Sequence, residues 1–248
     1  IHLSTDGHLV MAYLFLKAQG LAGKLVADIR IDGAGKKVTR SDNCRVSDLS
    51  VSSDNLTFTY EAKSLPYPID TSYYDNEKHT QADALSVIPF MDEMNYEGLS
   101  VSGLSDGYYG LTIGGEFIGR FTARELERGI NMALLQNTPQ YKQAMKIRQM
   151  NEERWLKERK MREFYWVEYN LMRKTGMLWA CNEAAVDTLR KYRPHDIFLQ
   201  WNGDLWLQYM HKGIREDCVN EQQDLVNQIY EQNKPIPLRI EIKKFTDL

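Results

Sequence analysis

The sequence predicts an α+β protein, with a β-rich part followed by a mainly helical part. Short alternating apolar segments, separated by Gly, Asp and Asn, fill residues 25–121, a pattern typical of strands joined by tight turns. The stretch 140–174 contains neither Gly nor Pro, which favours one long helix. With 43% apolar and 26% charged residues over 248 positions, the composition is sufficient for a packed core.

The first expected element is a helix. Residues 4–6 (Ser-Thr-Asp) offer capping side chains before the apolar run 8–18, and Gly20 supplies a stop. Residue 1 is Ile, with no basic or apolar leader before the helix, so we expect that a longer parent chain has been cut here.

A small antiparallel β domain is expected over residues 24–121. Gly114-Gly115 lies between two apolar segments and predicts a two-residue hairpin, because both turn positions need a positive φ. The polar, proline-containing stretch 65–84 predicts an extended loop. The expected strands are 26–31, 45–51, 56–62, 99–101, 109–113 and 116–121.

The third expected segment, residues 122–248, is helical with a terminal strand. Thr122 and Glu125 form a capping-box pattern that predicts a helix over 123–135. Thr138 and Pro139 begin the next helix as N-cap and first helical residue. The remaining expected elements are one long helix over 140–174, a helix over 178–192 that completes a long helical hairpin with it, a helix over 216–232, and a strand over 238–244. With residues 1–23 as the end of a preceding domain, the predicted organisation is 1–23, 24–121 and 122–248.

Composition and motifs exclude several classes of function. The net charge of -3 gives no general attraction for nucleic acid, and no apolar run is long enough to span a membrane. Glycine-rich nucleotide loops and the HExxH zinc motif are absent. Cys44, Cys181 and Cys218 are far apart, which indicates separate thiols, although one disulfide stays open.

Two aromatic patterns in the sequence are candidate binding surfaces. The stretch 140–174 carries ten Lys or Arg against five Glu, interleaved with aromatic residues. It could bind RNA or a membrane surface, but i,i+4 pairs such as Glu153-Lys157 and Glu158-Arg162 favour a solvated, packed helix. A second set could stack on sugar rings, although core packing is the favoured interpretation. This set is Trp179, Trp201, Trp206, Tyr209 and Tyr230.

The N-terminal block HLSTDGHLVMA, residues 2–12, resembles the last motif block of the SGNH or GDSL-type hydrolase superfamily. In that block a catalytic His is followed five residues later by Gly and then by an apolar helix with a small inner residue. His2, Gly7 and Ala12 have this spacing, with Leu3 in place of the usual Pro. The later stretches VADIRID, GLSDGYYGLTIGGEFIGRF and ARELERGINMALLQNTPQYKQA are similar to the C-terminal region of exported Bacteroides-type acylhydrolases of that superfamily.

This resemblance implies that residues 1–23 end an SGNH α/β/α hydrolase domain, in which His2 is the general base of a Ser-His-Asp triad. The Ser and Asp would lie upstream, so the isolated chain is expected to be inactive. The resemblance further implies a small acyl-ester substrate, such as an acetylated glycan, an upstream hydrolase domain as partner, and a periplasmic or secreted location. It implies no metal or organic cofactor.

Structural roles are expected for several other residues near these motifs. Asp6 is expected to act as a cap or first-turn acid, and His8 to help pack the helix. Gly129 and Asn131 could line a cleft, but a close helix contact and an ordinary polar residue explain them equally well. The alternative function is an accessory module, residues 24–248, that binds glycan or protein without catalytic activity of its own.

Overall fold

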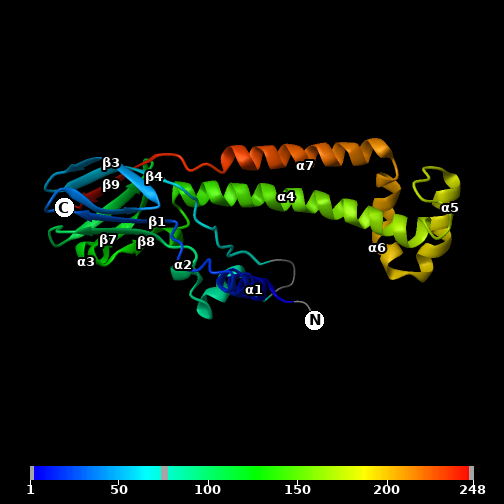
Figure 1. Ribbon diagram of the computed structural model, residues 1–248, viewed down its shortest axis with the longest axis horizontal. Coiled ribbons are helices and arrows are strands. Elements are labelled where there is room, and N and C mark those ends of the chain that lie inside the picture. Colours follow the sequence, from blue (N-terminus) through cyan, green and yellow to red (C-terminus); the bar gives the residue numbers. More distant parts are fainter. Residues whose placement is uncertain (1–2, 74–77, 246–248) are drawn as a thin grey trace. The chain divides into compact units, whose positions relative to one another are not determined.

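The computed structural model describes residues 3–73 and 78–245. The chain divides into two compact units, and each is described by itself. The β-rich unit comprises Ile1–Lys146 and Asn233–Leu248, and the helical unit comprises Ile147–Gln232 (Figure 1). The division into 1–23, 24–121 and 122–248 expected from the sequence stays a prediction.

One sheet of the β-rich unit has four strands in the order β2-β1-β5-β8. These strands are β1 (Ala27–Asp32), β2 (Lys37–Asp42), β5 (Glu97–Ser102) and β8 (Ile130–Asn131). β1 and β5 pair in parallel, with Ile29 opposite Leu99. A parallel pair needs a long crossover connection, here the whole stretch from β2 to α2. The expectation of a purely antiparallel domain is therefore wrong at this pair.

The second sheet has five strands, all antiparallel, in the order β3-β4-β9-β6-β7. These are β3 (Cys44–Val51), β4 (Asn55–Ala62), β6 (Tyr108–Ile113), β7 (Glu116–Thr122) and β9 (Leu238–Lys244). The predicted strand 238–244 is confirmed as β9, which lies between β4 and β6. Gly114 and Gly115 have φ of 59° and 86°, which confirms the predicted hairpin.

Buried side chains from both sheets form one core. Ile29 and Leu99 come from the first sheet and Phe58, Leu111 and Ile240 from the second, and each is fully enclosed. α3 (Ala123–Arg128) lies against β5 and adds Leu126. The predicted helix 123–135 ends early, because Gly129 turns the chain at φ 94° into β8 and the 3-10 turn Met132–Leu134.

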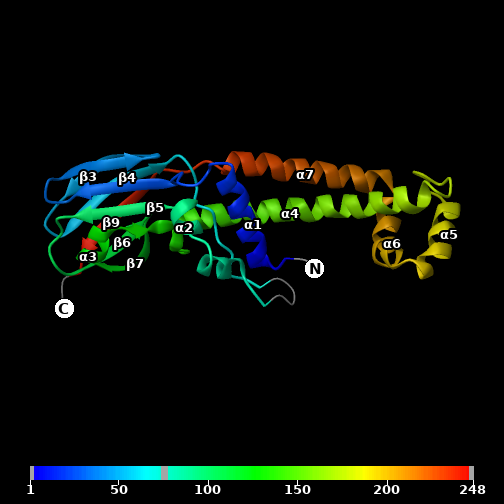
Figure 2. The same ribbon diagram turned by 60° about the horizontal axis from the view of Figure 1, so that its bottom comes forward.

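The N-terminal helix packs on a smaller core. α1 (Thr5–Ala18) lies beside α2 (Phe90–Glu93) (Figure 2). It buries Leu9 and Tyr13 in a cluster with side chains of α2 and η1 (Gln81–Ser86). Tyr13 donates a 2.7 Å hydrogen bond to Glu93. The predicted first helix is confirmed, while the predicted loop 65–84 leads into η1.

The helical unit contains most of the long helix α4 and the three shorter helices α5, α6 and α7. α4 (Pro139–Val167) begins after Thr138 as predicted, and the residues from Ile147 belong to this unit. The chain then continues through the π-helical turn η3 (Glu168–Met172), α5 (Glu183–Tyr192), η4 (Arg193–His195), α6 (Ile197–Tyr209) and α7 (Lys212–Gln232). No helix in the part of the chain that the structure describes is long and apolar enough to cross a membrane.

The partner of α4 is α7, not the expected helix at 178–192. Lys157 on α4 contacts Glu221 on α7 at 2.7 Å, and both views show the two helices side by side (Figures 1 and 2). Gly176 and Trp179 adopt φ of 74° and 63°, which turns the chain before α5. α5 begins only at Glu183 and has ten residues, so it is too short to run alongside the length of α4.

A buried glutamate joins the segments of the helical core. Glu168 is 1% exposed. Its Oε1 accepts a 2.8 Å hydrogen bond from Trp206 Nε1, and its Oε2 accepts one of 2.8 Å from the backbone N of Trp179. Both carboxylate oxygens are therefore satisfied, as a buried carboxylate requires.

Candidate functional site

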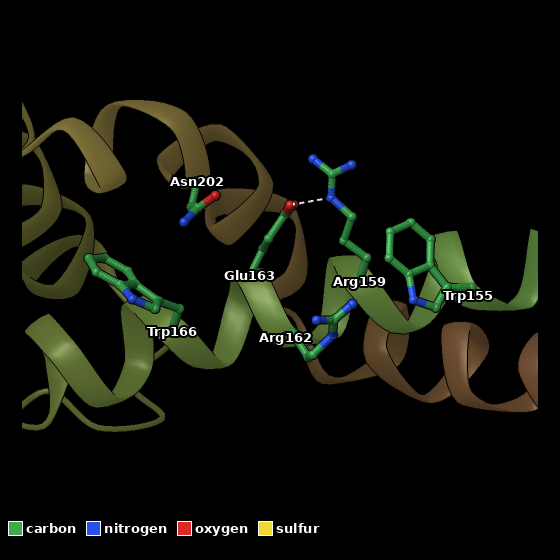
Figure 3. A pocket seen from close by; sticks show the side chains of 6 residues that line it. All are labelled: Trp155, Arg159, Arg162, Glu163, Trp166 and Asn202. Carbon is green, nitrogen blue, oxygen red and sulfur yellow. Dashed lines mark hydrogen bonds and ion pairs between the residues drawn. The ribbon is translucent and has the colours of Figure 1, made fainter. Parts of the chain in front are cut away.

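One side of α4 presents a row of aromatic and basic side chains to a pocket. Trp155, Arg159, Arg162 and Trp166 follow one another at intervals of four, three and four residues. This spacing places them on the same side of a helix. At 1.5 Å per residue the two indoles are attached roughly 16 Å apart along the helix axis. The row therefore forms an elongated surface with a tryptophan near each end (Figure 3).

The charges along this row are neutralised locally. Arg159 Nε contacts Glu163 Oε1 at 2.7 Å, and Arg162 Nε contacts Glu158 Oε1 at 2.8 Å. The guanidinium of Arg162 also lies 5.7 Å from the ring centroid of Trp155, a cation–π distance. The pocket thus offers hydrogen-bond donors and acceptors together without a net field of either sign.

α6 supplies the opposite side of the pocket. Asn202 projects toward the row from α6 (Figure 3), and its side-chain amide has no hydrogen-bond partner among the described residues. Trp166 packs against Phe198 of α6 with ring centroids 5.2 Å apart, and Phe198 contacts Trp201 at 5.5 Å. The pocket has a volume of about 340 Å³. It is lined by Trp155, Arg159, Arg162, Glu163, Trp166 and Asn202.

The aromatic set expected from the sequence does not form one cluster. Trp206 and Tyr209 are buried core residues, which agrees with the favoured packing interpretation. Trp179 packs against Tyr165 and Tyr169, whereas Trp201 contacts Phe198 on α6 and does not line the pocket. Tyr230 is 75% exposed on α7. Sequence reasoning missed the grouping of Trp155, Trp166 and Phe198 because helix α6 was not predicted; the spacing of 155 and 166 was the available signal.

The expected catalytic residue, His2, lies outside the described residues. Nearby, Asp6 accepts hydrogen bonds from the hydroxyl of Ser4 and from the N–H of Gly7, and His79 Nδ1 lies 3.9 Å from its other oxygen. The hydrogen bond from Ser4 is the main cause that lowers the pKa of Asp6. Ser4 and His79 both face the acid, whereas a Ser-His-Asp relay needs the histidine between the other two. Asp6 is thus the expected first-turn acid.

His8, Ala12 and Asn131 do not have the positions that the sequence analysis considered for them. His8 and Ala12 are exposed on α1, so the packing role of His8 is wrong, and Ala12 does not lie on the buried side of the described helix. Asn131 donates to the carbonyls of Met91 and Asn95 and accepts from the N–H of Glu97. It is a structural residue that joins β5, β8 and α2, rather than a cleft residue.

The β-rich unit contains a buried acid. Glu97 is 0% exposed, and its Oε1 accepts hydrogen bonds from Tyr60 Oη at 2.8 Å and Gln140 Nε2 at 3.2 Å. Glu97 Oε2 and Gln140 Oε1 are buried without a hydrogen-bond partner among the described residues. Burial raises the pKa of Glu97 to about 7, against the lowering effect of the two hydrogen bonds. Since no solvent reaches it, this carboxyl is a stability element.

The three cysteines are separate thiols in the structure. Cys44 and Cys218 are buried free thiols, and Cys181 is exposed with Sγ 3.4 Å from His211 Nδ1. Across residues 3–73 and 78–245, no group of three or more His, Cys, Asp or Glu side chains is arranged to hold a metal ion.

Comparison with known proteins adds two findings. Residues 145–234 match a family described as the diltiazem deacetylase C-terminal helical domain, and this range nearly coincides with the helical unit. A solved structure, described as BT4096, a gut microbial diltiazem-metabolizing enzyme, matches 99% of this chain with a TM-score of 0.92 and 39% sequence identity. The chain covers 55% of that protein's chain. No curated protein matches the chain.

These matches correct the resemblance proposed from the sequence. The family that matches is the diltiazem deacetylase helical domain, and no SGNH or GDSL-type family matches. The assignment of residues 1–23 to the end of an SGNH hydrolase domain is therefore withdrawn. A short motif such as residues 2–12 carries little information beside a match over 99% of the chain.

Proposed function

We propose that this chain takes part in the hydrolytic removal of acetyl groups. The observation that carries the proposal is the match of 99% of the chain, at 39% identity and a TM-score of 0.92, to a diltiazem-metabolizing enzyme. The match of residues 145–234 to a family named for diltiazem deacetylase supports the same chemistry. The proposed substrate is an acetyl ester, with O-acetylated carbohydrate as the narrower class. Water adds to the acetyl carbonyl, the ester C–O bond breaks, and acetate and an alcohol are released.

We further propose that a hydrolase domain packs on the exposed side of α1. Met11, Leu14 and Phe15 are 55%, 51% and 64% exposed, although the opposite side of the same helix already buries Leu9 and Tyr13. A helix that is apolar on both sides is typically buried on both. The chain covers just over half of the enzyme it resembles, so the remainder of such an enzyme is the proposed occupant.

The test is acetate release from diltiazem and from p-nitrophenyl acetate by the natural polypeptide that contains this chain. We expect turnover of at least one ester, and a strong loss of turnover in Phe15→Asp if the hydrolase domain packs on α1. Circular dichroism would check that the variant folds. A folded wild-type protein that releases no acetate from either ester would contradict the deacetylase proposal.

The same assay tests His2. Its role as general base stays a prediction, and we expect His2→Gln to abolish turnover whereas His8→Gln, at an exposed position on α1, retains it. Equal activity of the two variants would show that His2 is not the base.

A second candidate function is ligand binding by the helical unit, without bond cleavage. The observation that favours it is the α4–α6 pocket, which is lined by Trp155 and Asn202. Trp155 is 47% exposed, and Trp201, which contacts Phe198 on α6, is 67% exposed. Loss of retention on a glycan column after Trp201→Ala would support this function. Unchanged retention would count against a role for this aromatic surface.

A further inference from the structure

The α4–α6 pocket combines three properties that limit its ligands. It has an indole toward each end, its two arginines are paired with glutamates, and the side-chain amide of Asn202 from α6 has no hydrogen-bond partner within residues 3–73 and 78–245. The pocket belongs entirely to the helical unit, so its geometry does not depend on the other unit.

The paired charges disfavour an ionic ligand. An anion would compete with Glu163 for Arg159, and a cation would meet two guanidinium groups. Nucleic acid, which needs unpaired basic groups along the helix, is disfavoured for the same reason. A wholly apolar ligand would cover these ion pairs and remove their water without replacing its hydrogen bonds.

The exposed rings favour a flat ligand with an apolar face. Trp155 is 47% exposed at one end, and Trp166 continues into exposed Phe198 and Trp201 at the other. Indole faces contribute binding energy through contact with flat apolar surfaces. Between them, guanidinium, carboxylate and amide groups can each bond a group that both donates and accepts, which is the property of a hydroxyl.

We propose that the α4–α6 pocket binds an uncharged, hydroxyl-rich sugar ring, as part of a short oligosaccharide lying along α4 from Trp155 to Trp166. C–H faces of the sugar stack on the indoles, and its hydroxyls bond Arg159, Glu163 and Asn202. This deepens the proposed binding function of the helical unit and is independent of the deacetylation proposal, because binding requires no ester and no turnover.

The test is isothermal titration of the 248-residue chain with neutral hexasaccharides, namely cellohexaose, xylohexaose and mannohexaose, and with oligogalacturonate of the same length. We expect at least one neutral sugar to bind and oligogalacturonate to bind more weakly. Trp155→Ala and Trp166→Ala should each weaken binding by about tenfold, the effect of losing one ring contact. Asn202→Ala should weaken it less.

Tyr230→Ala is the matched control, since Tyr230 is an exposed aromatic residue of the same unit outside the pocket. Its binding should equal that of the wild type. Because Trp166 is partly buried, circular dichroism and the melting temperature of each variant check folding, and the more exposed Trp155 keeps the test decisive if Trp166→Ala unfolds.

Four results would overturn the proposal. They are the absence of binding to all three neutral sugars, tighter binding of oligogalacturonate, binding that survives Trp155→Ala in a folded chain, and self-association that Trp155→Ala abolishes. The last result would make the pocket an interface between two copies of the chain. Because no ester is hydrolysed in this experiment, its failure leaves the deacetylase proposal standing, and the reverse also holds.

Discussion

The β-rich unit and the helical unit each enclose a glutamate, and they satisfy it differently. In the helical unit both oxygens of Glu168 accept hydrogen bonds of 2.8 Å. In the β-rich unit both hydrogen bonds converge on Oε1 of Glu97, and Oε2 has no partner among the described residues. Equal burial therefore does not guarantee equal hydrogen bonding, because each carboxylate oxygen needs its own donor when water is excluded.

The largest expected effect is in the helical unit. Glu168→Ala leaves the indole N–H of Trp206 and the backbone N–H of Trp179 buried without an acceptor, and we expect the free energy of unfolding to fall by about 3–5 kcal/mol. Urea denaturation followed by far-UV circular dichroism would measure it. Glu168→Gln keeps one acceptor and should cost less. If both variants lose less than about 1 kcal/mol, the two hydrogen bonds do not stabilise the unit in the way proposed.

The next effect is the pH dependence from Glu97. The folded chain holds this proton up to about pH 7, whereas an unfolded glutamic acid loses it near pH 4.5, so the folded state binds more protons between these values. The free energy of unfolding should therefore fall as the pH rises from 4.5 through 7, by on the order of 3 kcal/mol in total. Denaturation at several pH values would measure this slope.

Glu97→Gln should remove that slope, because the amide does not titrate. Glu116→Gln, at an exposed position on β7, is the control and should keep the wild-type slope. A wild-type protein whose stability rises between pH 5 and 7, with no change in Glu97→Gln, would show that Glu97 is ionised in the fold.

Removal of a helix N-cap should cause a smaller loss of stability, and each unit offers one such cap for comparison. Thr122 Oγ1 accepts from Glu125 N at 3.1 Å in the β-rich unit, and Asn182 Oδ1 accepts from Ala185 N at 3.0 Å in the helical unit. Thr122→Ala and Asn182→Ala should each cost about 1 kcal/mol. Amide hydrogen exchange would assign each loss to its unit. Loss of protection in both units after one substitution would mean that they unfold together.

The smallest expected effect on stability is at the pocket. Glu163→Gln removes an exposed i,i+4 ion pair with Arg159 and should cost less than about 0.5 kcal/mol. The same change frees Arg159 and gives the pocket a positive charge, so oligogalacturonate should gain affinity relative to neutral sugars. An unchanged preference in titrations would contradict the role assigned to charge pairing.

Much of the local structure could be predicted because it depends on neighbours in the chain. The Gly114-Gly115 hairpin, the Thr122 cap and the ion pairs of Lys157 and Arg162 follow from short spacings, and all are observed. The sequence analysis did not predict other elements, because contacts between residues far apart in the chain determine whether they form. The short strand β2 has an exposed pattern that carries no alternation, and α6 is apolar over most of its surface, which blurs its helical period.

The candidate site shows the same division. The sequence determined the α+β class, the row of Trp155, Arg159, Arg162 and Trp166 on one side of a helix, and the i,i+4 pairs that neutralise it, because helical geometry converts spacing into position. Only the tertiary structure decided that α6 places Asn202 and Phe198 beside that row and that α7, rather than α5, runs alongside α4. It also decided that Oε2 of Glu97 has no donor among the described residues. Those outcomes depend on which surfaces exclude water together, and this property belongs to contacts between residues that the chain keeps far apart.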